Sequence, residues 1–366
     1  MNNNNYNRGE LRTGRDSKSR VVSSHTEHYR KVSYIAIIVA VLALIAVTCL
    51  IFSAFWEEFI PVWNVDVGGG EQPEPKSPYI ASEGGVELED DYLKSEFAIL
   101  IRLSDMTTIA HQNADVTFRP ASMTKVMTVV TALDLIENLD DVYTFHPSVL
   151  EGMDAQSSTA EMKYIYNTYL DDPDFGDCVS YSVRDLLYGI SYRSGADSVL
   201  CLLDYLELTW NEFVALMNEK AKEIGLENTH FGGAIGMDVE KNETTARDMA
   251  AIMTYAMENP VCKEFFGGTS YRLTYIKMTY RNRTLYETLN AMKTTPEKVL
   301  NGKYTIISTK SGLEDEAGYC LVSCIKNNDT GELFVLVTAN AKKGTKYTAS
   351  ENPILDMQTL FDKFKP

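Results

Sequence analysis

Histidine and cysteine are scarce in this sequence and widely spaced along it. The 366 residues include five histidines and six cysteines, and no two cysteines form a C-x-x-C pair. Without a His/Cys cluster of metal-ligand spacing, the sequence predicts no metal site. A Gly-rich phosphate loop and a G-x-S-x-G elbow are also missing, so neither a nucleotide site nor a Ser-His-Asp site is predicted. We therefore expect no cofactor.

Positive charge is also in short supply. The chain has 34 Lys and Arg against 51 Asp and Glu, a formal net charge of -17. A nucleic-acid partner is not expected, because binding to phosphate backbones requires a basic face. The charge is unevenly distributed: residues 1–32 carry seven basic and three acidic residues, or +4, which leaves -21 for the rest.

The segment 33–56 contains no charged residue over its 24 positions. About 20 apolar residues span a bilayer as a helix, and Tyr34 and Trp56 lie where interfacial aromatics are found. A cleaved signal peptide is the alternative, but its apolar core is typically about 7–15 residues and is followed by a small-residue cleavage site. Here two aromatic and two acidic residues follow instead. We favour a retained transmembrane helix.

Basic residues precede this segment and acidic residues follow it, so the positive-inside rule places the N-terminus in the cytoplasm and the rest outside the cell membrane. Residues 1–32 are predicted to be a disordered cytoplasmic tail. Residues 57–94, rich in Gly, Pro and acids, are predicted to be an extracytoplasmic linker. The folded domain is then expected over residues 95–366.

Five cysteines follow the apolar segment, and an odd number leaves at least one of them unpaired within the chain. Cys320 and Cys324 lie in one predicted strand, about 13 Å apart at the rise of a β-strand. That separation is too long for a disulfide. We expect these cysteines to be small buried hydrophobic residues.

The folded domain is predicted to run from strands through helices and back to strands. Capping-box patterns predict helix starts at Ser182, Thr209 and Thr245. Strands are expected at 97–103, 107–111, 270–290, 303–310, 317–326 and 332–340, and further helices at about 122–137 and 354–364. This order predicts an α+β fold with a mainly antiparallel sheet packed by helices.

The most informative motif is Ser122-Met123-Thr124-Lys125, an S-x-x-K at the start of a predicted helix. Residues three apart share one helix face, so the amine of Lys125 can reach the hydroxyl of Ser122. A serine needs an adjacent base to act as a nucleophile, and a lysine is a base at neutral pH only when its pKa is lowered. By itself this spacing also fits an N-cap serine beside a surface lysine.

Two further short motifs follow in the chain. Ser194-Gly195-Ala196 lies between helical segments, and Lys310-Ser311-Gly312 ends a predicted strand. In the second triplet the lysine supplies charge and the hydroxyl a hydrogen bond, while the glycine leaves room for a substrate beside the backbone. Such an edge is suited to binding a carboxylate.

The order S-x-x-K, S-x-x and K-S-G resembles the signature of penicillin-binding proteins and β-lactamases. Longer strings make the resemblance closest to the serine D-alanyl-D-alanine carboxypeptidases; they include RPASMTKVMT (119–128), FVALMNEKAKEIGLENTHF (213–231), TTARDMA (244–250) and KSGLEDEAGYCLVS (310–323). The resemblance covers the region from about residue 95 to 365. The resemblance implies a transpeptidase-like fold with an all-helical subdomain and a site in the cleft beside the sheet.

The resemblance also implies roles for individual residues. Ser122 would attack the peptide bond between two D-alanines of a peptidoglycan stem peptide, Lys125 would take its proton, and β-lactams would acylate the same serine. Ser194 would pass a proton to the leaving D-alanine. Lys310 and Ser311, next to Gly312, would hold the terminal carboxylate. The backbone N–H groups of Ser122 and Leu313 would form the oxyanion hole.

One position departs from the family pattern, which is usually Ser-x-Asn in the second motif, whereas Ala196 stands here. A hydrogen bond to a charged group contributes about 1.5–3 kcal/mol, so the missing amide would cost roughly 10- to 150-fold in rate. Asp197 is a candidate to replace part of the function of the missing amide. The more common explanation for an aspartate at this position is that it stabilises the N-terminus of a helix. A weakened relative that only binds cell-wall peptide, or a β-lactamase, therefore stays open as an alternative.

Overall fold

The structure is a computed structural model that describes residues 77–146, 149, 180–237, 241–268, 270–280, 283–290, 300–341 and 351–366. These residues belong to one compact unit. The predicted tail (1–32), the predicted membrane span (33–56) and the first part of the predicted linker lie outside the described residues. Within the described ranges, no helix has the length and apolar character needed to cross a membrane.

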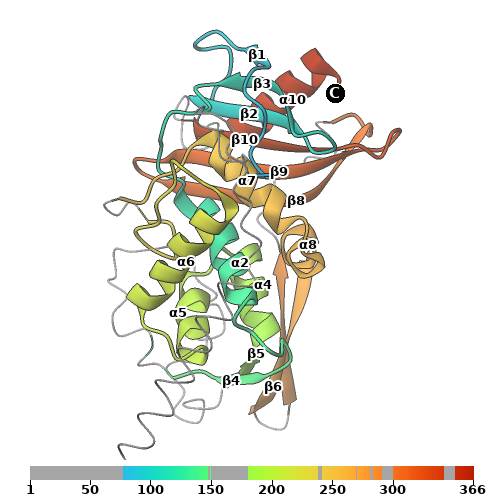
Figure 1. Cartoon of the computed structure of the whole chain (residues 1–366). Helices are drawn as coiled ribbons and strands as arrows, with labels where there is room; N and C mark the ends of the chain where they lie inside the picture. Colours follow the sequence, from blue (N-terminus) through green and yellow to red (C-terminus); the bar gives the residue numbers. More distant parts are fainter. Residues whose placement is uncertain are drawn as a thin grey trace, which may run out of the picture. The chain divides into compact units, whose positions relative to one another are not determined.

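A six-stranded sheet forms one end of the described unit (Figure 1). Its strands lie in the order β1-β3-β2-β10-β9-β8, and every neighbouring pair is antiparallel except β1 with β3. The bounds are β1 (Val86–Glu87), β2 (Phe97–Arg102), β3 (Thr107–Gln112), β8 (Tyr304–Glu314), β9 (Gly318–Asn327) and β10 (Leu333–Ala341). The mainly antiparallel sheet predicted from the sequence is confirmed.

Both faces of this sheet are covered, which explains why β2 is apolar from Phe97 to Ile101. Successive side chains of a strand point to opposite faces. Ile99 belongs to the larger hydrophobic cluster together with Met253 of α7 (Ala246–Ala256), and Leu100 belongs to the smaller one together with Leu360 of α10 (Asn352–Phe364). The central strands therefore lie between α7 and α10 (Figure 1).

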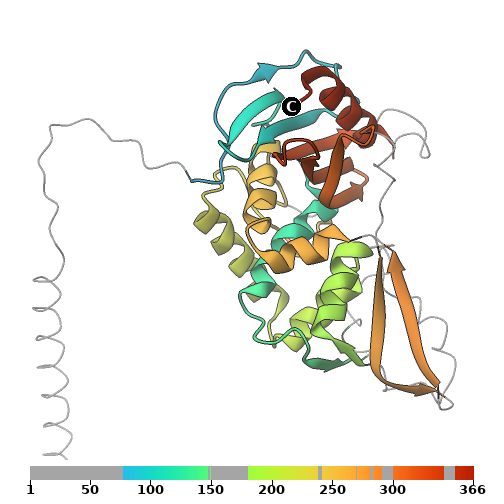
Figure 2. The same cartoon turned by 90° about the vertical axis from the view of Figure 1, so that its right-hand side faces the viewer.

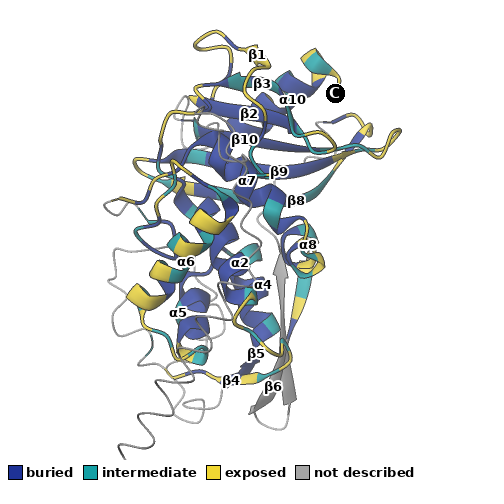
Figure 3. Ribbon diagram, in the orientation of Figure 1, coloured by how far each residue is buried: buried dark blue, intermediate teal, exposed yellow. Residues whose placement is uncertain are grey.

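The remaining helices pack below the sheet in the view of Figure 1. They are the 3-10 helix η1 (Ala121–Thr124) and the α-helices α2 (Lys125–Leu133), α4 (Val183–Tyr192), α5 (Ala196–Tyr205), α6 (Trp210–Ile224) and α8 (Pro260–Gly267). Helix α2 is buried along nearly its entire length (Figure 3). Two small sheets complete the fold: β4 (Val142–Thr144) with β5 (Ser180–Ser182), and the hairpin of β6 (Ser270–Tyr280) and β7 (Arg283–Asn290) in Figure 2.

The predicted helix starts are confirmed by their caps. Ser182 and Thr209 form complete capping boxes at α4 and α6, and the hydroxyl of Thr245 accepts a hydrogen bond from the backbone N–H of Asp248 at α7. Gly225 ends α6 with a φ of 87°, a left-handed conformation that glycine adopts without strain.

Three features differ from the sequence predictions. The helix expected at about 122–137 begins as a 3-10 turn and ends at Leu133. After this residue, the backbone N–H groups of Leu135 and Ile136 both donate hydrogen bonds to the carbonyl oxygen of Ala132. A helix that was not predicted, α8, begins at Pro260, and the side chain of Asn259 caps its N-terminus.

The third difference concerns the start of the folded part. Ala81, Leu88 and Leu93 lie in the predicted linker, yet each is at most 5% exposed. These side chains join the two hydrophobic clusters of the unit. Residues 77–94 are therefore part of the packed structure, and the folded domain extends N-terminally of Ser95. The prediction failed because isolated apolar residues among acids and glycines show no periodicity.

The cysteine prediction is confirmed where it can be followed. Cys201, Cys262, Cys320 and Cys324 are all buried, and none of them forms a disulfide within the described part of the chain. Cys49 and Cys178 lie outside the described residues.

Candidate active site

Ser122 lies in the short 3-10 helix η1, directly before helix α2, which is buried from Lys125 to Ala132. The preceding residue, Ala121, has a φ of 47°, in the left-handed region that residues with a Cβ seldom adopt. A backbone of this kind persists only when its surroundings hold it in place, and it is found most often at functional sites.

Two glycines make room for this strained turn. A Cβ on Gly236 would lie 2.0 Å from the carbonyl oxygen of Ala121, and a Cβ on Gly312 would lie 3.0 Å from the backbone N of Ser122. Any side chain at either position would displace η1. The turn that presents Ser122 is therefore held between the segment at Gly236 and strand β8.

The amine of Lys125 points at the Ser122 hydroxyl. Its Nζ donates to Ser122 Oγ at 3.0 Å and to the carbonyl oxygen of Ile235 at 2.6 Å. The Lys125 side chain is fully buried, whereas Ser122 remains partly exposed. A serine hydroxyl open to substrate and a shielded amine within hydrogen-bonding distance are the arrangement required for an activated nucleophile.

Burial lowers the pKa of Lys125 to about 7, because the charged ammonium form loses its hydration. The negative charges of Glu314 and Asp197 oppose this effect. A substantial fraction of Lys125 is therefore neutral at neutral pH. A base whose pKa lies near the working pH is the most effective proton acceptor.

The side chain of Lys310, in β8, contacts Ser194 of the second motif. Its Nζ donates to Ser194 Oγ at 3.0 Å and to the carbonyl oxygen of Ser311 at 2.7 Å. Ser194 has a φ of 57° in the turn between α4 and α5 and is 6% exposed. Burial, followed by the charge of Lys125, holds the pKa of Lys310 well below its ordinary value.

Strand β8 completes the site along its edge. It is the last strand of the six-stranded sheet in the described part of the chain, and Gly312 lies against η1. Ser311 is half-buried and Leu313 is 49% exposed. All seven residues that the motifs singled out thus come together, from η1, α2, the α4–α5 turn and β8.

The position that departs from the family pattern lies at the start of α5. Ala196 is the first residue of the helix and is 1% exposed. Asp197 follows it, is 7% exposed, and accepts a hydrogen bond from the backbone N–H of Ser198 at 2.7 Å. The prediction of an acid at a helix N-terminus is confirmed, and its charge also acts on Lys125.

Sequence reasoning missed three contributors to this site. Ile235 acts through its backbone carbonyl and Gly236 through its lack of a side chain, and neither has a recognisable signal of its own in the sequence. Glu314 was visible as an acid two residues after Gly312. Because side chains alternate along a strand, it lies on the same face of β8 as Lys310 and Gly312.

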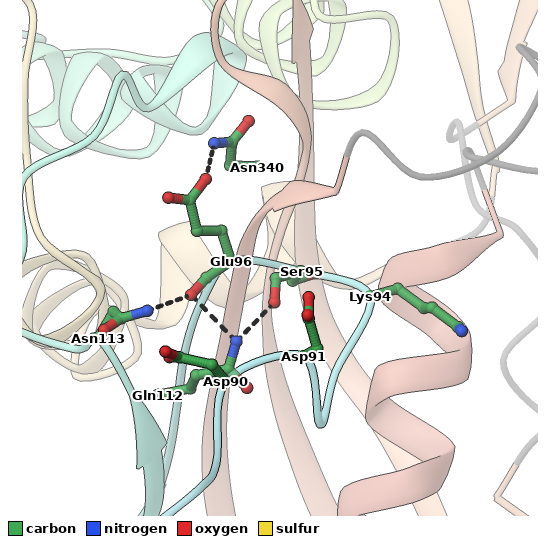
Figure 4. A pocket seen from close by; sticks show the side chains of 8 residues that line it. All are labelled: Asp90, Asp91, Lys94, Ser95, Glu96, Gln112, Asn113 and Asn340. Carbon is green, nitrogen blue, oxygen red and sulfur yellow. Dashed lines mark hydrogen bonds between the residues drawn. The ribbon is translucent and has the colours of Figure 1, made fainter.

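Two cavities of the described unit lie away from these residues. The larger, of about 510 Å³, lies at the ends of β2, β3 and β10. Figure 4 shows its polar lining, in which Asn340 donates to Glu96 and the amine of Lys94 points away from the other side chains. The smaller, of about 420 Å³, lies between α2, α7 and α8. Among the described residues, no three His, Cys, Asp or Glu side chains group closely enough to hold a metal ion.

A comparison with protein families matches residues 86–343 to the family described as D-alanyl-D-alanine carboxypeptidase. The match covers well over half of the chain, and it includes η1, the α4–α5 turn and β8.

Curated relatives belong to the same group of proteins. The D-alanyl-D-alanine carboxypeptidase DacF of Bacillus subtilis is 24% identical over 269 residues, which cover 72% of this chain and 62% of the relative. The D-alanyl-D-alanine carboxypeptidase DacC of Escherichia coli is 29% identical over 247 residues, covering 67% of this chain and 56% of that protein. The chain thus spans somewhat more than half the length of these relatives.

Solved structures show the same fold. The DD-transpeptidase of Streptomyces K15 superposes with a TM-score of 0.60 at 23% sequence identity, over 76% of this chain and 99% of that one. The predicted transpeptidase-like arrangement of an antiparallel sheet and helices is confirmed by this likeness.

Proposed function

We propose that this chain, which belongs to the D-alanyl-D-alanine carboxypeptidase family, is a serine peptidase that removes the terminal D-alanine from peptidoglycan stem peptides. The observation that carries the proposal is the contact between the buried amine of Lys125 and the hydroxyl of Ser122, beside Gly312 of β8. A nucleophile, its base and a strand edge for the substrate are thereby placed in one site.

In the first chemical step, the Ser122 hydroxyl gives its proton to the neutral amine of Lys125 as Oγ attacks the carbonyl carbon between the two D-alanines. The C–N bond then breaks, and the leaving D-alanine takes up a proton. Ser194 is suited to relay that proton because its hydroxyl lies 3.0 Å from Nζ of Lys310. Water hydrolyses the resulting ester and restores the serine.

Substrate binding is proposed to use strand β8. An extended peptide can add to the free edge of a sheet through main-chain hydrogen bonds. Lys310 and Ser311 would then hold the terminal carboxylate. The backbone N–H groups of Ser122 and Leu313 would stabilise the oxyanion that forms on the attacked carbonyl. The close approach of Gly312 to Ser122 supports this pairing of two backbone donors.

A second candidate follows from Ala196. Without an amide at this position, the protein could bind stem peptide and react with β-lactams while turning substrate over slowly. A β-lactamase, which releases hydrolysed penicillin rapidly, is the third and least favoured candidate. All three candidate proteins would form an acyl-enzyme on Ser122. They differ in the rate at which that acyl-enzyme is hydrolysed.

We further propose that residues 33–56 anchor the protein in the cell membrane, with the N-terminus in the cytoplasm and the catalytic domain outside. The support is the uncharged 24-residue segment and the basic residues before it. Peptidoglycan lies on that side of the membrane, so the substrate and the site would share one compartment.

Release of D-alanine from a peptide ending in D-Ala-D-Ala tests the proposal. Full-length protein is expected to release it, and Ser122→Ala is expected to abolish release. Stable labelling by fluorescent penicillin without D-alanine release would favour the binding protein instead. Rapid penicillin turnover would favour the β-lactamase.

A further inference from the structure

One ion pair joins the segment that carries the nucleophile to the strand that meets it. The Nε of Arg119 lies 2.8 Å from Oε2 of Glu316. Arg119 lies three residues before Ser122, and Glu316 lies three residues after Leu313, in the turn between β8 and β9. The pair therefore links the two chain segments that contain Ser122 and Leu313.

The two segments are also in contact at Gly312. A Cβ on this glycine would lie 3.0 Å from the backbone N of Ser122 and 3.1 Å from the carbonyl oxygen of Pro120. Such packing prevents the segments from moving closer together, but dispersion contacts between a few atoms resist separation only weakly. An ion pair four residues beyond Gly312 adds an attraction that opposes separation.

The turn at Ala121 requires support of this kind. Its φ of 47° is a strained conformation, which persists only when the surrounding structure holds it. Arg119 lies two residues before Ala121, and Ser122 follows Ala121 directly. A contact that holds Arg119 to the β8–β9 turn therefore also restrains the strained residue and the nucleophile after it.

The pair is too exposed to be important for overall stability. The Arg119 side chain is 33% exposed and that of Glu316 is 65% exposed. Ion pairs at the surface contribute little to the free energy of unfolding, and salt weakens them. A loss of activity on breaking this pair would therefore not be explained by unfolding.

We propose that Arg119 and Glu316 are positioning residues that hold η1 against β8 and so set the separation of the two backbone N–H groups that stabilise the oxyanion. This inference rests on the proposed function for its catalytic meaning. The two donors act only within about 2.7–3.1 Å of the oxygen that becomes negative. A wider gap between η1 and β8 weakens at least one of these hydrogen bonds.

Glu316→Gln is expected to slow acylation by a chromogenic β-lactam about 3- to 30-fold, without a matching loss of affinity in the non-covalent complex or of thermal stability. Arg119→Gln should have the same effect. The variant with both substitutions should be no slower than either single variant, because the two residues act as one pair. Exchanging the charges, with Arg119→Glu and Glu316→Arg together, should restore much of the rate.

Two control variants separate the pair from its charge. Asp315→Asn removes a negative charge from the same turn, at an exposed residue, and leaves the pair intact. Asp105→Asn breaks an exposed ion pair of 2.7 Å with Arg102, in the hairpin of β2 and β3. At pH 9, both should acylate as fast as the unchanged protein. An equal loss in Asp315→Asn and Glu316→Gln, or no loss in Glu316→Gln, would overturn the proposal.

Hydrogen–deuterium exchange of the full chain distinguishes a failure of this proposal from a failure of the proposed function. Peptides covering residues 119–124 and 310–316 should exchange faster in Glu316→Gln than in Asp315→Asn, because the two segments are held less firmly. Faster exchange in a protein that never acylates would refute the proposed function alone. Equal exchange in the two variants would refute the role of the pair, whatever the acylation rate.

Discussion

The amine of Lys125 lies 3.0 Å from the hydroxyl of Ser122 while its side chain is completely shielded from solvent. The shielding matters as much as the distance. An exposed lysine at the same distance would carry a proton at neutral pH and could not accept another from the serine.

Acylation by a β-lactam is expected to rise with pH through a midpoint near 7, the pKa of Lys125. Only the neutral amine accepts the serine proton, so the rate falls about tenfold per pH unit below the midpoint. Stopped-flow acylation rates between pH 5 and 9 measure this profile. Lys125→Met should lower the plateau by about 10²- to 10⁴-fold, while Lys222→Met, on the exposed side of α6, should leave it unchanged. A flat profile would remove Lys125 from the mechanism.

Glu314→Gln is expected to move the same midpoint to lower pH. The Glu314 charge is the strongest of the charges that raise the Lys125 pKa against the effect of burial, so its loss makes the amine less basic. Asp315→Asn removes an equal charge from the next residue, which is exposed, and should produce a smaller shift because solvent screens it. Equal shifts in the two variants would show that only the overall charge matters.

Gly312→Ala is expected to slow acylation while the protein remains folded. The added methyl group would lie 2.9 Å from Ala121 Cβ and 3.0 Å from Ser122 N, so strand and nucleophile must move apart. A displacement of about 1 Å at a reacting centre can cost about 10²-fold. Acylation rates and thermal melting of the variant check this together. An unchanged rate would mean that β8 takes no part in aligning the serine.

Ala196→Asn is expected to raise turnover of a D-Ala-D-Ala peptide. Restoring a hydrogen bond to a charged group corresponds to about 10- to 150-fold in rate. Because Ala196 is 1% exposed, the larger side chain should also lower stability, by about 1–3 kcal/mol if the surroundings are overpacked. D-alanine release and thermal melting are the measurements. A slower enzyme would show that the cleft has adapted to alanine.

The catalytic side chains of this site could be predicted from the sequence, because their chemistry and order form motifs. The contributions of its backbone could not be predicted. Ser122, Lys125 and Lys310 could be identified from their residue types and their order along the chain. The starts of three helices could likewise be predicted from their capping residues. The carbonyl of Ile235 and the space left by Gly236 depend on how distant segments meet. Nothing in local composition or periodicity encodes such a meeting.

The boundaries failed for a related reason. Ala121 adopts a left-handed conformation because packing imposes it, so the helix that the apolar spacing predicted from Ser122 begins instead as a 3-10 turn. The buried residues between 77 and 94 show the same limit, since their burial is decided by the strands and helices they reach. Even the lowered pKa of Lys125 follows from burial, which the motif alone did not establish.

Mass spectrometry of the penicillin-treated full-length protein tests the account most directly. After proteolysis, the account predicts a single penicilloyl adduct on the peptide that contains Ser122, and no adduct in Ser122→Ala. An adduct on any other residue, or none after prolonged treatment at pH 8, would contradict it.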